Sequence, residues 1–266
     1  RSLKVMAGTF VLTVSLILCM IFVPKKNALD TLQKREAKAK ETGKMTEEQL
    51  AKQKANGSES EDTICTANLT DDEILEGLNL LLIGDSIAVD VTDDFYEMFP
   101  NSVSDTKIGR ITSLGKQVLD SYIDEKKWEG EGVIFASLSN SPINGELEDI
   151  REKIGKDMPL FLTTVRIPHD TFEDESNSKI KKFVEENDHT YLIDWYAASE
   201  GHDEYFDADD THLLSAGAKA YANCIKEAVL DAYKKENIEI PKSRLVSSTD
   251  TSTDSSNDSS TNASTE

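Results

Sequence analysis

Short apolar runs alternate with helical patterns through the middle of the chain, and this alternation is the strongest constraint on its fold. Runs such as NLLLI and VIFASL are almost wholly apolar, which is typical of parallel strands covered on both faces. We expect strands at 79–83, 102–108, 133–138, 159–165 and 190–194, and helices near 88–99, 111–127, 145–155, 176–187 and 213–235. The pattern predicts a three-layer α/β/α fold around a five-stranded parallel sheet.

Composition divides the 266 residues into four parts. Residues 1–26 contain a long, uncharged apolar run, Val5 to Val23, which favours a transmembrane helix over a cleaved secretory signal. Residues 27–63 are rich in Lys, Glu, Gln and Ala with few recurring apolar residues, so we expect a polar, partly helical linker. Residues 64–242 form the globular domain. Residues 243–266 are almost wholly Ser, Thr, Asp and Asn and are expected to be disordered.

The net charge of −21 argues against nucleic acid as a partner, because phosphate binding needs clustered Lys and Arg. The histidines and cysteines show no metal-ligand spacing, so neither a metal nor a cofactor is expected. Cys65 and Cys224 fall in the globular part, where they either pair in a disulfide or remain free thiols.

Three residues form a candidate catalytic set. Ser86 directly follows the first expected strand, at the start of a helix. A nucleophile at this position has the backbone N–H groups of the helix N-terminus beside it, and these can stabilise a developing oxyanion. A serine nucleophile needs a base, and His212 precedes the last helix. Asp209 lies three residues before His212 and can orient its imidazole. His202 is the alternative base, but no Asp precedes it at that spacing.

Two further residues follow neighbouring strands and can stabilise an oxyanion. Gly109 follows the second strand and can offer its backbone N–H at a close approach. Asn140 follows the third strand and can donate from its side-chain amide. Either residue can also be a simple turn residue.

The ordered blocks Gly84-Asp85-Ser86, Gly109, Asn140 and Asp209-x-x-His212 resemble those of the SGNH (GDSL-type) hydrolase superfamily. The resemblance covers about residues 79–235. Together with Arg166-Ile-Pro168 and the apolar N-terminal run, the blocks resemble the surface domain of peptidoglycan O-acetyltransferase A and related bacterial acyltransferases. This chain departs from the family at Ser139-Asn140-Ser141, where a Gly-rich turn is usual, and at Asp210 and Thr211.

The resemblance implies a serine O-acyltransferase that acetylates peptidoglycan at the muramoyl C6 hydroxyl. Ser86 would be the nucleophile, His212 the base and Asp209 its orienting acid, with the oxyanion held by the Ser86 and Gly109 N–H groups and the Asn140 amide. A membrane acyltransferase domain would deliver the acetyl group. The chain would be anchored by one helix in a Gram-positive bacterial membrane, with the catalytic domain outside. The alternatives are an SGNH esterase acting on carbohydrate or lipid, and a non-enzymatic glycan-binding module.

Overall fold

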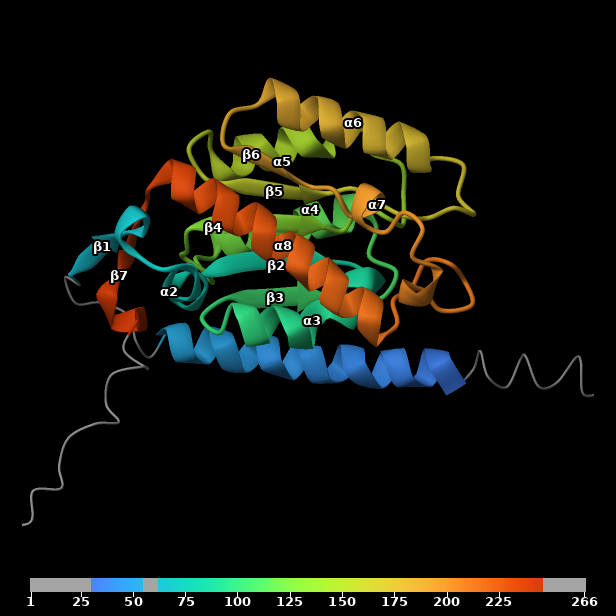
Figure 1. Ribbon diagram of the computed structural model, residues 1–266, viewed down its shortest axis with the longest axis horizontal. Coiled ribbons are helices and arrows are strands. Elements are labelled where there is room, and N and C mark those ends of the chain that lie inside the picture. The colour runs from blue at the N-terminus through green and yellow to red at the C-terminus, as the bar shows by residue number, and fades with distance from the viewer. Residues whose placement is uncertain (1–29, 55–61, 246–266) are drawn as a thin grey trace, which may run out of the picture.

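A central sheet of five parallel strands organises the chain, whose computed structural model describes residues 30–54 and 62–245 (Figure 1). The strands lie in the order β3-β2-β4-β5-β6. Their bounds are β2 (Leu80–Gly84), β3 (Val103–Thr106), β4 (Gly132–Ala136), β5 (Leu160–Thr163) and β6 (Thr190–Ile193). The predicted five-stranded parallel sheet is therefore confirmed.

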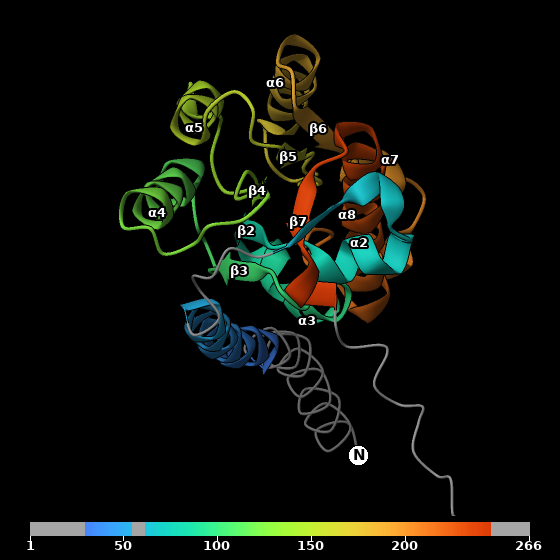
Figure 2. The ribbon, with the colours of Figure 1, turned by 90° about the vertical axis from the view of Figure 1, so that its left-hand side faces the viewer.

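Helices cover both faces of this sheet (Figure 2). One face carries α2 (Asp71–Gly77), α3 (Ser86–Met98) and α8 (Ser215–Glu236). The other carries α4 (Thr112–Asp124), α5 (Glu146–Ile154) and α6 (Glu173–Glu186). Two separate clusters of buried apolar side chains result, one on each side of the sheet. The three-layer α/β/α arrangement is as predicted.

Small elements complete the domain at its two ends. The strands β1 (Thr63–Cys65) and β7 (Glu239–Pro241) pair antiparallel and join the beginning of the domain to its end. The short helix α7 (Trp195–Ala198) follows β6, and single turns lie at Thr66–Asn68, Asp203–Tyr205 and Lys242–Leu245. Cys65 and Cys224 are both free thiols, so the disulfide alternative is not formed.

Residues 30–54 form one long helix that lies along the edge strand β3 (Figure 1). The Thr46 hydroxyl donates to the Ser104 carbonyl of β3 at 2.6 Å, and the Ser104 N–H donates to the Tyr96 hydroxyl at 3.0 Å. Gln49 and Gln53 bind backbone carbonyls of the turn before β3. The helix over residues 30–54 thus covers the edge strand and satisfies the Ser104 carbonyl, while Tyr96 of α3 satisfies the Ser104 N–H.

The contact face of this helix was not expected from the sequence, which showed too few apolar residues for a packing stripe. The face is made mainly of polar residues at helical spacing, with Met45 and Leu50 packing beside them: Arg35, Lys38, Thr42, Thr46, Gln49 and Gln53. Their side chains bind backbone atoms and carboxylates of the domain rather than an apolar groove. Residues 30–54 are therefore packed against the globular part instead of forming an independent spacer.

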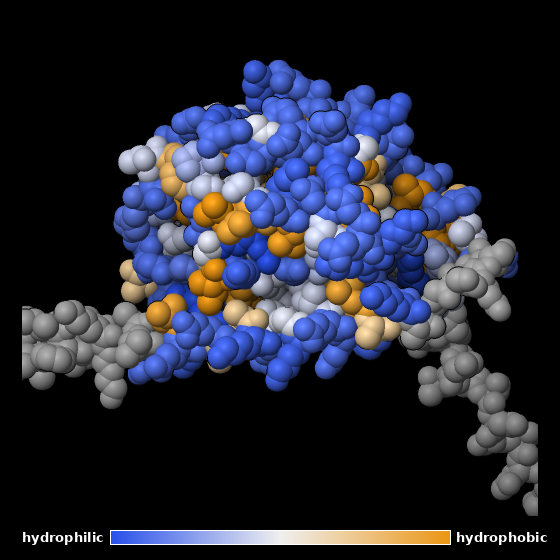
Figure 3. Space-filling view, turned by 180° about the vertical axis from the view of Figure 1, so that it is seen from behind, coloured by the Kyte–Doolittle hydropathy of each residue, from blue (hydrophilic) through white to orange (hydrophobic). Residues whose placement is uncertain are grey.

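The predicted transmembrane run lies outside the described residues, and so does the predicted disordered tail beyond residue 245. At residues 243–245 the prediction of disorder is wrong, because these residues belong to the helical turn Lys242–Leu245. Within residues 30–54 and 62–245, no helix combines the length and the apolar character needed to cross a bilayer. The face opposite α8 is largely hydrophilic, with hydrophobic residues as separate spots (Figure 3). This surface agrees with the 30% of charged residues in the sequence.

We predict opposite effects from one substitution at two glycines. A Cβ at Gly84 would lie 2.1 Å from the Ala88 Cβ, so Gly84→Ala should lower the free energy of unfolding by about 1–3 kcal/mol through overpacking. A Cβ at Gly43, on the helix over residues 30–54, would meet no atom within 4 Å. Gly43→Ala should raise the stability by up to about 1 kcal/mol, because alanine favours a helix. Urea unfolding of both variants tests this, and a neutral Gly84→Ala would contradict the close β2–α3 packing.

Candidate active site

The candidate residues converge because parallel strands end at one edge of the sheet. Ser86 follows β2 as the first residue of α3, Gly109 follows β3, and Asn140 follows β4. These three strands are neighbours in the sheet. Ser86 is only 5% exposed. The strand order thus brings the three blocks to the same side of the molecule.

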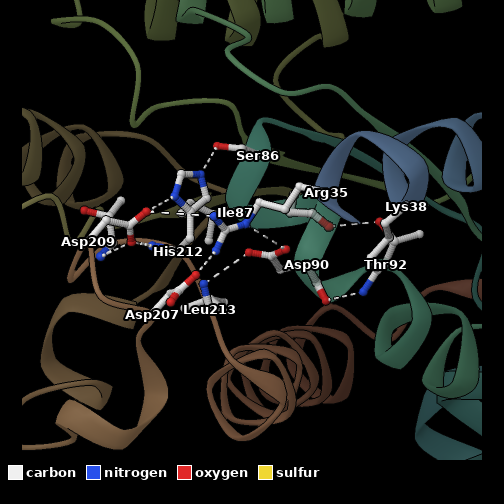
Figure 4. A network of polar contacts seen from close by, with 12 residues as sticks. Arg35, Lys38, Ser86, Ile87, Asp90, Thr92, Asp207, Asp209, His212 and Leu213 are labelled. Carbon is white, nitrogen blue, oxygen red and sulfur yellow. Dashed lines mark hydrogen bonds and ion pairs between the residues drawn. The ribbon is translucent and has the colours of Figure 1, made fainter. Parts of the chain in front are cut away.

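A continuous chain of hydrogen bonds links Ser86, His212 and Asp209 (Figure 4). The Ser86 Oγ lies 2.9 Å from the His212 Nε2. On the other side of the ring, the His212 Nδ1 lies 2.7 Å from the Asp209 Oδ2. The three side chains therefore have the relative geometry that a serine nucleophile, a base and an orienting acid require.

The loop itself fixes the Asp209 carboxylate. Its Oδ1 accepts hydrogen bonds from the backbone N–H groups of Thr211 at 3.2 Å and His212 at 2.9 Å. Burial opposes ionisation, but these bonds and the His212 ring outweigh it and hold the pKa of Asp209 below its ordinary value. Asp210 takes a positive φ of 54°, which allows the tight turn between Asp209 and His212. Asp209 is therefore ionised near neutral pH and well placed to orient the imidazole.

Backbone contacts close the base of this loop. Phe206 and Leu213 form an isolated antiparallel bridge, and the Asp207 N–H donates to the His212 carbonyl at 2.8 Å. The Leu213 N–H donates to Asp90 Oδ2 on α3 at 3.1 Å. Since α3 also begins at Ser86, this last bond ties the loop that carries His212 to the helix that carries the serine.

Asp85 joins the first block to the loop after β4. It caps α3 by accepting from the Ile87 N–H at 3.0 Å. Its other oxygen accepts from the Ser139 N–H at 3.2 Å and the Ser139 hydroxyl at 2.5 Å. The carboxyl is completely buried, and burial raises its pKa although these hydrogen bonds act in the opposite direction. Asp85 therefore positions the residue next to Asn140, a role that the sequence pattern did not reveal.

Gly109 and Asn140 have different surroundings at this edge. Gly109 has a φ of 67°, a conformation that favours glycine. The next residue, Arg110, is buried and donates to the Gly84 carbonyl at 3.0 Å, which holds the turn against the end of β2. Asn140 is exposed, and its amide donates to the Ser139 hydroxyl at 3.3 Å. Neither residue has a hydrogen bond to Ser86 among the contacts of the described residues, so their oxyanion roles stay predictions.

The other three histidines are engaged elsewhere. His202, the alternative base, lies 2.8 Å from Glu204 and stacks on the Tyr205 ring. His189 binds Glu236. His169 contacts Asp210 at 3.1 Å and so reaches the outer side of the loop that carries Asp209. Only His212 is paired with Ser86 among the described residues.

Arg35 also reaches the site, and sequence reasoning missed it. Its guanidinium, on the helix over residues 30–54, lies among the carboxylates of Asp90, Asp207 and Asp209 (Figure 4). The one available signal was the recurrence of polar residues at helical spacing in that segment. A search for apolar faces could not detect it.

We predict a pH-dependent loss of stability in Ser139→Ala. Because burial raises the folded-state pKa of Asp85, its stabilising effect is fully present below the unfolded pKa and is lost as pH rises through the folded pKa. The Ser139 hydroxyl lowers the pKa of Asp85 because it stabilises the charged carboxylate. Its removal should therefore lower the free energy of unfolding more at about pH 8 than at about pH 4, by about 1–3 kcal/mol. Urea unfolding at the two pH values measures this.

Ser141→Ala is the matched control, because the Ser141 hydroxyl binds Thr112 and no carboxylate. Its effect should be the same at both pH values. If the loss of stability in Ser139→Ala were also the same at both pH values, this would contradict the hydrogen-bonded pairing of Asp85 with Ser139.

Comparison with known proteins finds relatives that are named as O-acetyltransferases. No protein-family model matches the chain. The O-acetyltransferase OatA of Staphylococcus aureus (strain NCTC 8325 / PS 47) is 33% identical over 161 residues, which is 60% of this chain. The match spans 26% of that protein, about a quarter of its length.

One solved structure is similar in fold. The C-terminal catalytic domain of Streptococcus pneumoniae peptidoglycan O-acetyltransferase A, solved with a methylsulfonyl adduct, has a TM-score of 0.54 and 21% identity, covering 59% of this chain and 94% of that one. A lipase/acylhydrolase from Enterococcus faecalis has a TM-score of 0.48 and 18% identity, covering 58% and 96%. Over the matched region, this chain is a homologue of O-acetyltransferase OatA, and its α/β fold is similar to that of a peptidoglycan O-acetyltransferase catalytic domain.

Proposed function

We propose that this chain carries a serine-dependent O-acyltransferase domain that acts on cell-wall peptidoglycan through an acyl-Ser86 intermediate. The observation that supports this most strongly is the unbroken hydrogen-bonded path from Asp209 through His212 to Ser86. The homology to an O-acetyltransferase over the matched region supports the choice of an acetyl group and of transfer as the reaction.

In the first half-reaction, the Ser86 Oγ attacks the carbonyl carbon of the acyl donor while the His212 Nε2 accepts the hydroxyl proton. Asp209 stabilises the imidazolium that forms. The Ser86 and Gly109 N–H groups and the Asn140 amide stabilise the negative charge on the carbonyl oxygen. The tetrahedral intermediate then collapses, and the leaving group takes the proton from His212. Ser86 is left as an ester.

In the second half-reaction, a sugar hydroxyl binds in place of the leaving group. His212 takes its proton, and the oxygen attacks the carbonyl carbon of the acyl-Ser86 ester. Collapse of the second tetrahedral intermediate returns the proton to the Ser86 Oγ and releases the acylated sugar. We propose peptidoglycan as the acceptor, because a structural neighbour is a peptidoglycan O-acetyltransferase. We propose its muramoyl C6 hydroxyl as the attacking group, because the sequence blocks resemble those of the family that acetylates this hydroxyl.

The position of the helix over residues 30–54 supports delivery of the donor from a membrane. Its first turns lie at the site, because Arg35 contacts the loop that carries Asp209. Residue 30 follows Val23, the end of the apolar run, by seven residues. Seven extended residues reach at most about 25 Å. If the run spans a bilayer, residue 30 therefore lies within about 25 Å of the membrane. We propose that the site lies on the outer side of the cell, within reach of a membrane acyltransferase domain.

We predict that Ser86→Ala abolishes turnover of p-nitrophenyl acetate, with a loss of roughly 10⁴-fold or more, because the variant lacks the atom that forms the ester. Release of p-nitrophenol by the full chain measures this. Ser121→Ala is a control on α4, where the hydroxyl accepts only from Lys127 among the described contacts, and it should keep wild-type activity. Comparable activity in Ser86→Ala would remove the assignment of the nucleophile.

We predict that the wild-type chain transfers acetyl from p-nitrophenyl acetate to muropeptides, because a sugar hydroxyl bound beside His212 competes with water for the acyl-enzyme. Mass spectrometry of the muropeptides detects the added acetyl group, and Ser86→Ala supplies the blank. Release of free acetate with no acetylated sugar would indicate an esterase instead.

A further inference from the structure

We propose that Arg35 is a positioning residue of the active site, so that the helix over residues 30–54 contributes directly to the geometry of Asp209 and His212. This inference rests on the proposed function, and it concerns a residue outside the blocks that carry the family resemblance. Arg35 does not touch Ser86. It acts through the acid that orients the imidazole.

The contacts of the Arg35 guanidinium join three parts of the site. Its Nη2 donates to Asp207 Oδ2 at 3.1 Å, and its Nη1 lies 3.9 Å from Asp209 Oδ2. Its Nε lies 3.8 Å from Asp90 Oδ1 on α3. The first contact is a hydrogen bond, and the other two are ion-pair distances. One side chain thus connects the helix over residues 30–54, α3 and the loop that precedes His212.

The contact with Asp209 falls on the oxygen that matters most for the proposed chemistry. Asp209 Oδ2 is the atom that lies 2.7 Å from the His212 Nδ1. The neighbouring carboxylate of Asp207 belongs to the same loop, where its backbone N–H binds the His212 carbonyl. By binding Asp207 and Asp209, Arg35 therefore keeps the His212 imidazole in the orientation in which its Nε2 contacts the Ser86 Oγ.

Charge explains why the loop needs a cation here. Three carboxylates surround Arg35, and the side chain of Asp90 is only 10% exposed. Burial raises the pKa of Asp90. The Arg35 cation and the hydrogen bond from the Leu213 N–H act in the opposite direction and favour the charged form of Asp90. Arg35 itself is 14% exposed, so water screens its interactions only in part. Without it, like charges would repel across the loop and loosen the Asp209–His212 pair.

Arg35→Met in the full chain tests this inference, with Lys38→Met as the matched control. Lys38 lies one turn along the same helix and binds the Asp90 carbonyl at 2.8 Å and Asp93 at 3.2 Å, without a contact to Asp209. For p-nitrophenyl acetate, Arg35→Met should lower kcat roughly 10- to 100-fold, because small displacements of reacting groups cost factors of this size. KM should stay within about twofold. Lys38→Met should lower kcat far less, although it weakens docking of the same helix.

Two further variants separate positioning from general stability. Arg35→Lys keeps the positive charge but loses the planar fork, so it should restore part of the lost kcat; it also serves if Arg35→Met does not fold. In an Asp209→Asn background, Arg35→Met should cause little additional loss, because its effect passes through Asp209. The full additional loss in that background, equal losses in the Arg35 and Lys38 variants, or an unchanged kcat in Arg35→Met would each overturn the inference.

A spectroscopic readout tests the inference independently of turnover. The His212 Nδ1 proton, bonded to Asp209, should give a downfield ¹H NMR signal in the wild-type chain that shifts or broadens in Arg35→Met but not in Lys38→Met. An identical signal in both variants would overturn the positioning role. Absence of ester turnover in the wild-type chain would instead overturn the proposed function, and the NMR comparison would still decide the role of Arg35.

Discussion

The rest of the site depends on the two hydrogen bonds of the His212 imidazole. Its Nε2 lies 2.9 Å from the Ser86 Oγ, and its Nδ1 lies 2.7 Å from the Asp209 Oδ2. These partners come from opposite ends of the domain sequence. The end of β2 and the close contact of Gly84 with Ala88 place the serine. The Phe206–Leu213 bridge and the bond from the Leu213 N–H to Asp90 place the histidine. The hydrogen bond between His212 and Ser86 forms only when both sets of packing contacts are satisfied.

Buried and half-buried aspartates then connect the separate loops at the carboxyl edge of the sheet. Asp85 links the start of α3 to Ser139, and Asp90 links the middle of α3 to Leu213. Their burial carries a desolvation cost, which the hydrogen bonds of Asp85 and the Arg35 cation near Asp90 offset only in part, so that the pKa of each carboxyl stays raised. The helix over residues 30–54 thus has two structural tasks: it covers the edge strand β3 and it supplies Arg35.

The sequence was sufficient to predict the sheet, because strands such as Leu80–Gly84 and Gly132–Ala136 are buried on both faces and read as continuous apolar runs. It also predicted the pairing of Asp209 with His212, because three residues on one loop are close wherever the loop lies. It could not predict the contacts of Arg35, since its partners are up to 174 positions away and bind by charge rather than through an apolar stripe. The same limit applies to Asp85, whose capping role is local but whose link to Ser139 depends on the strand order.

The central claim is that Ser86 forms a covalent ester with the acyl group. The most direct test is to mix the full chain with p-nitrophenyl acetate, quench with acid during the first turnover, and locate the acetyl group by peptide mass spectrometry. The account predicts one acetyl group on the peptide that contains Ser86, at the serine itself. An acetyl group found only on another residue, while turnover proceeds at the same rate, would contradict it.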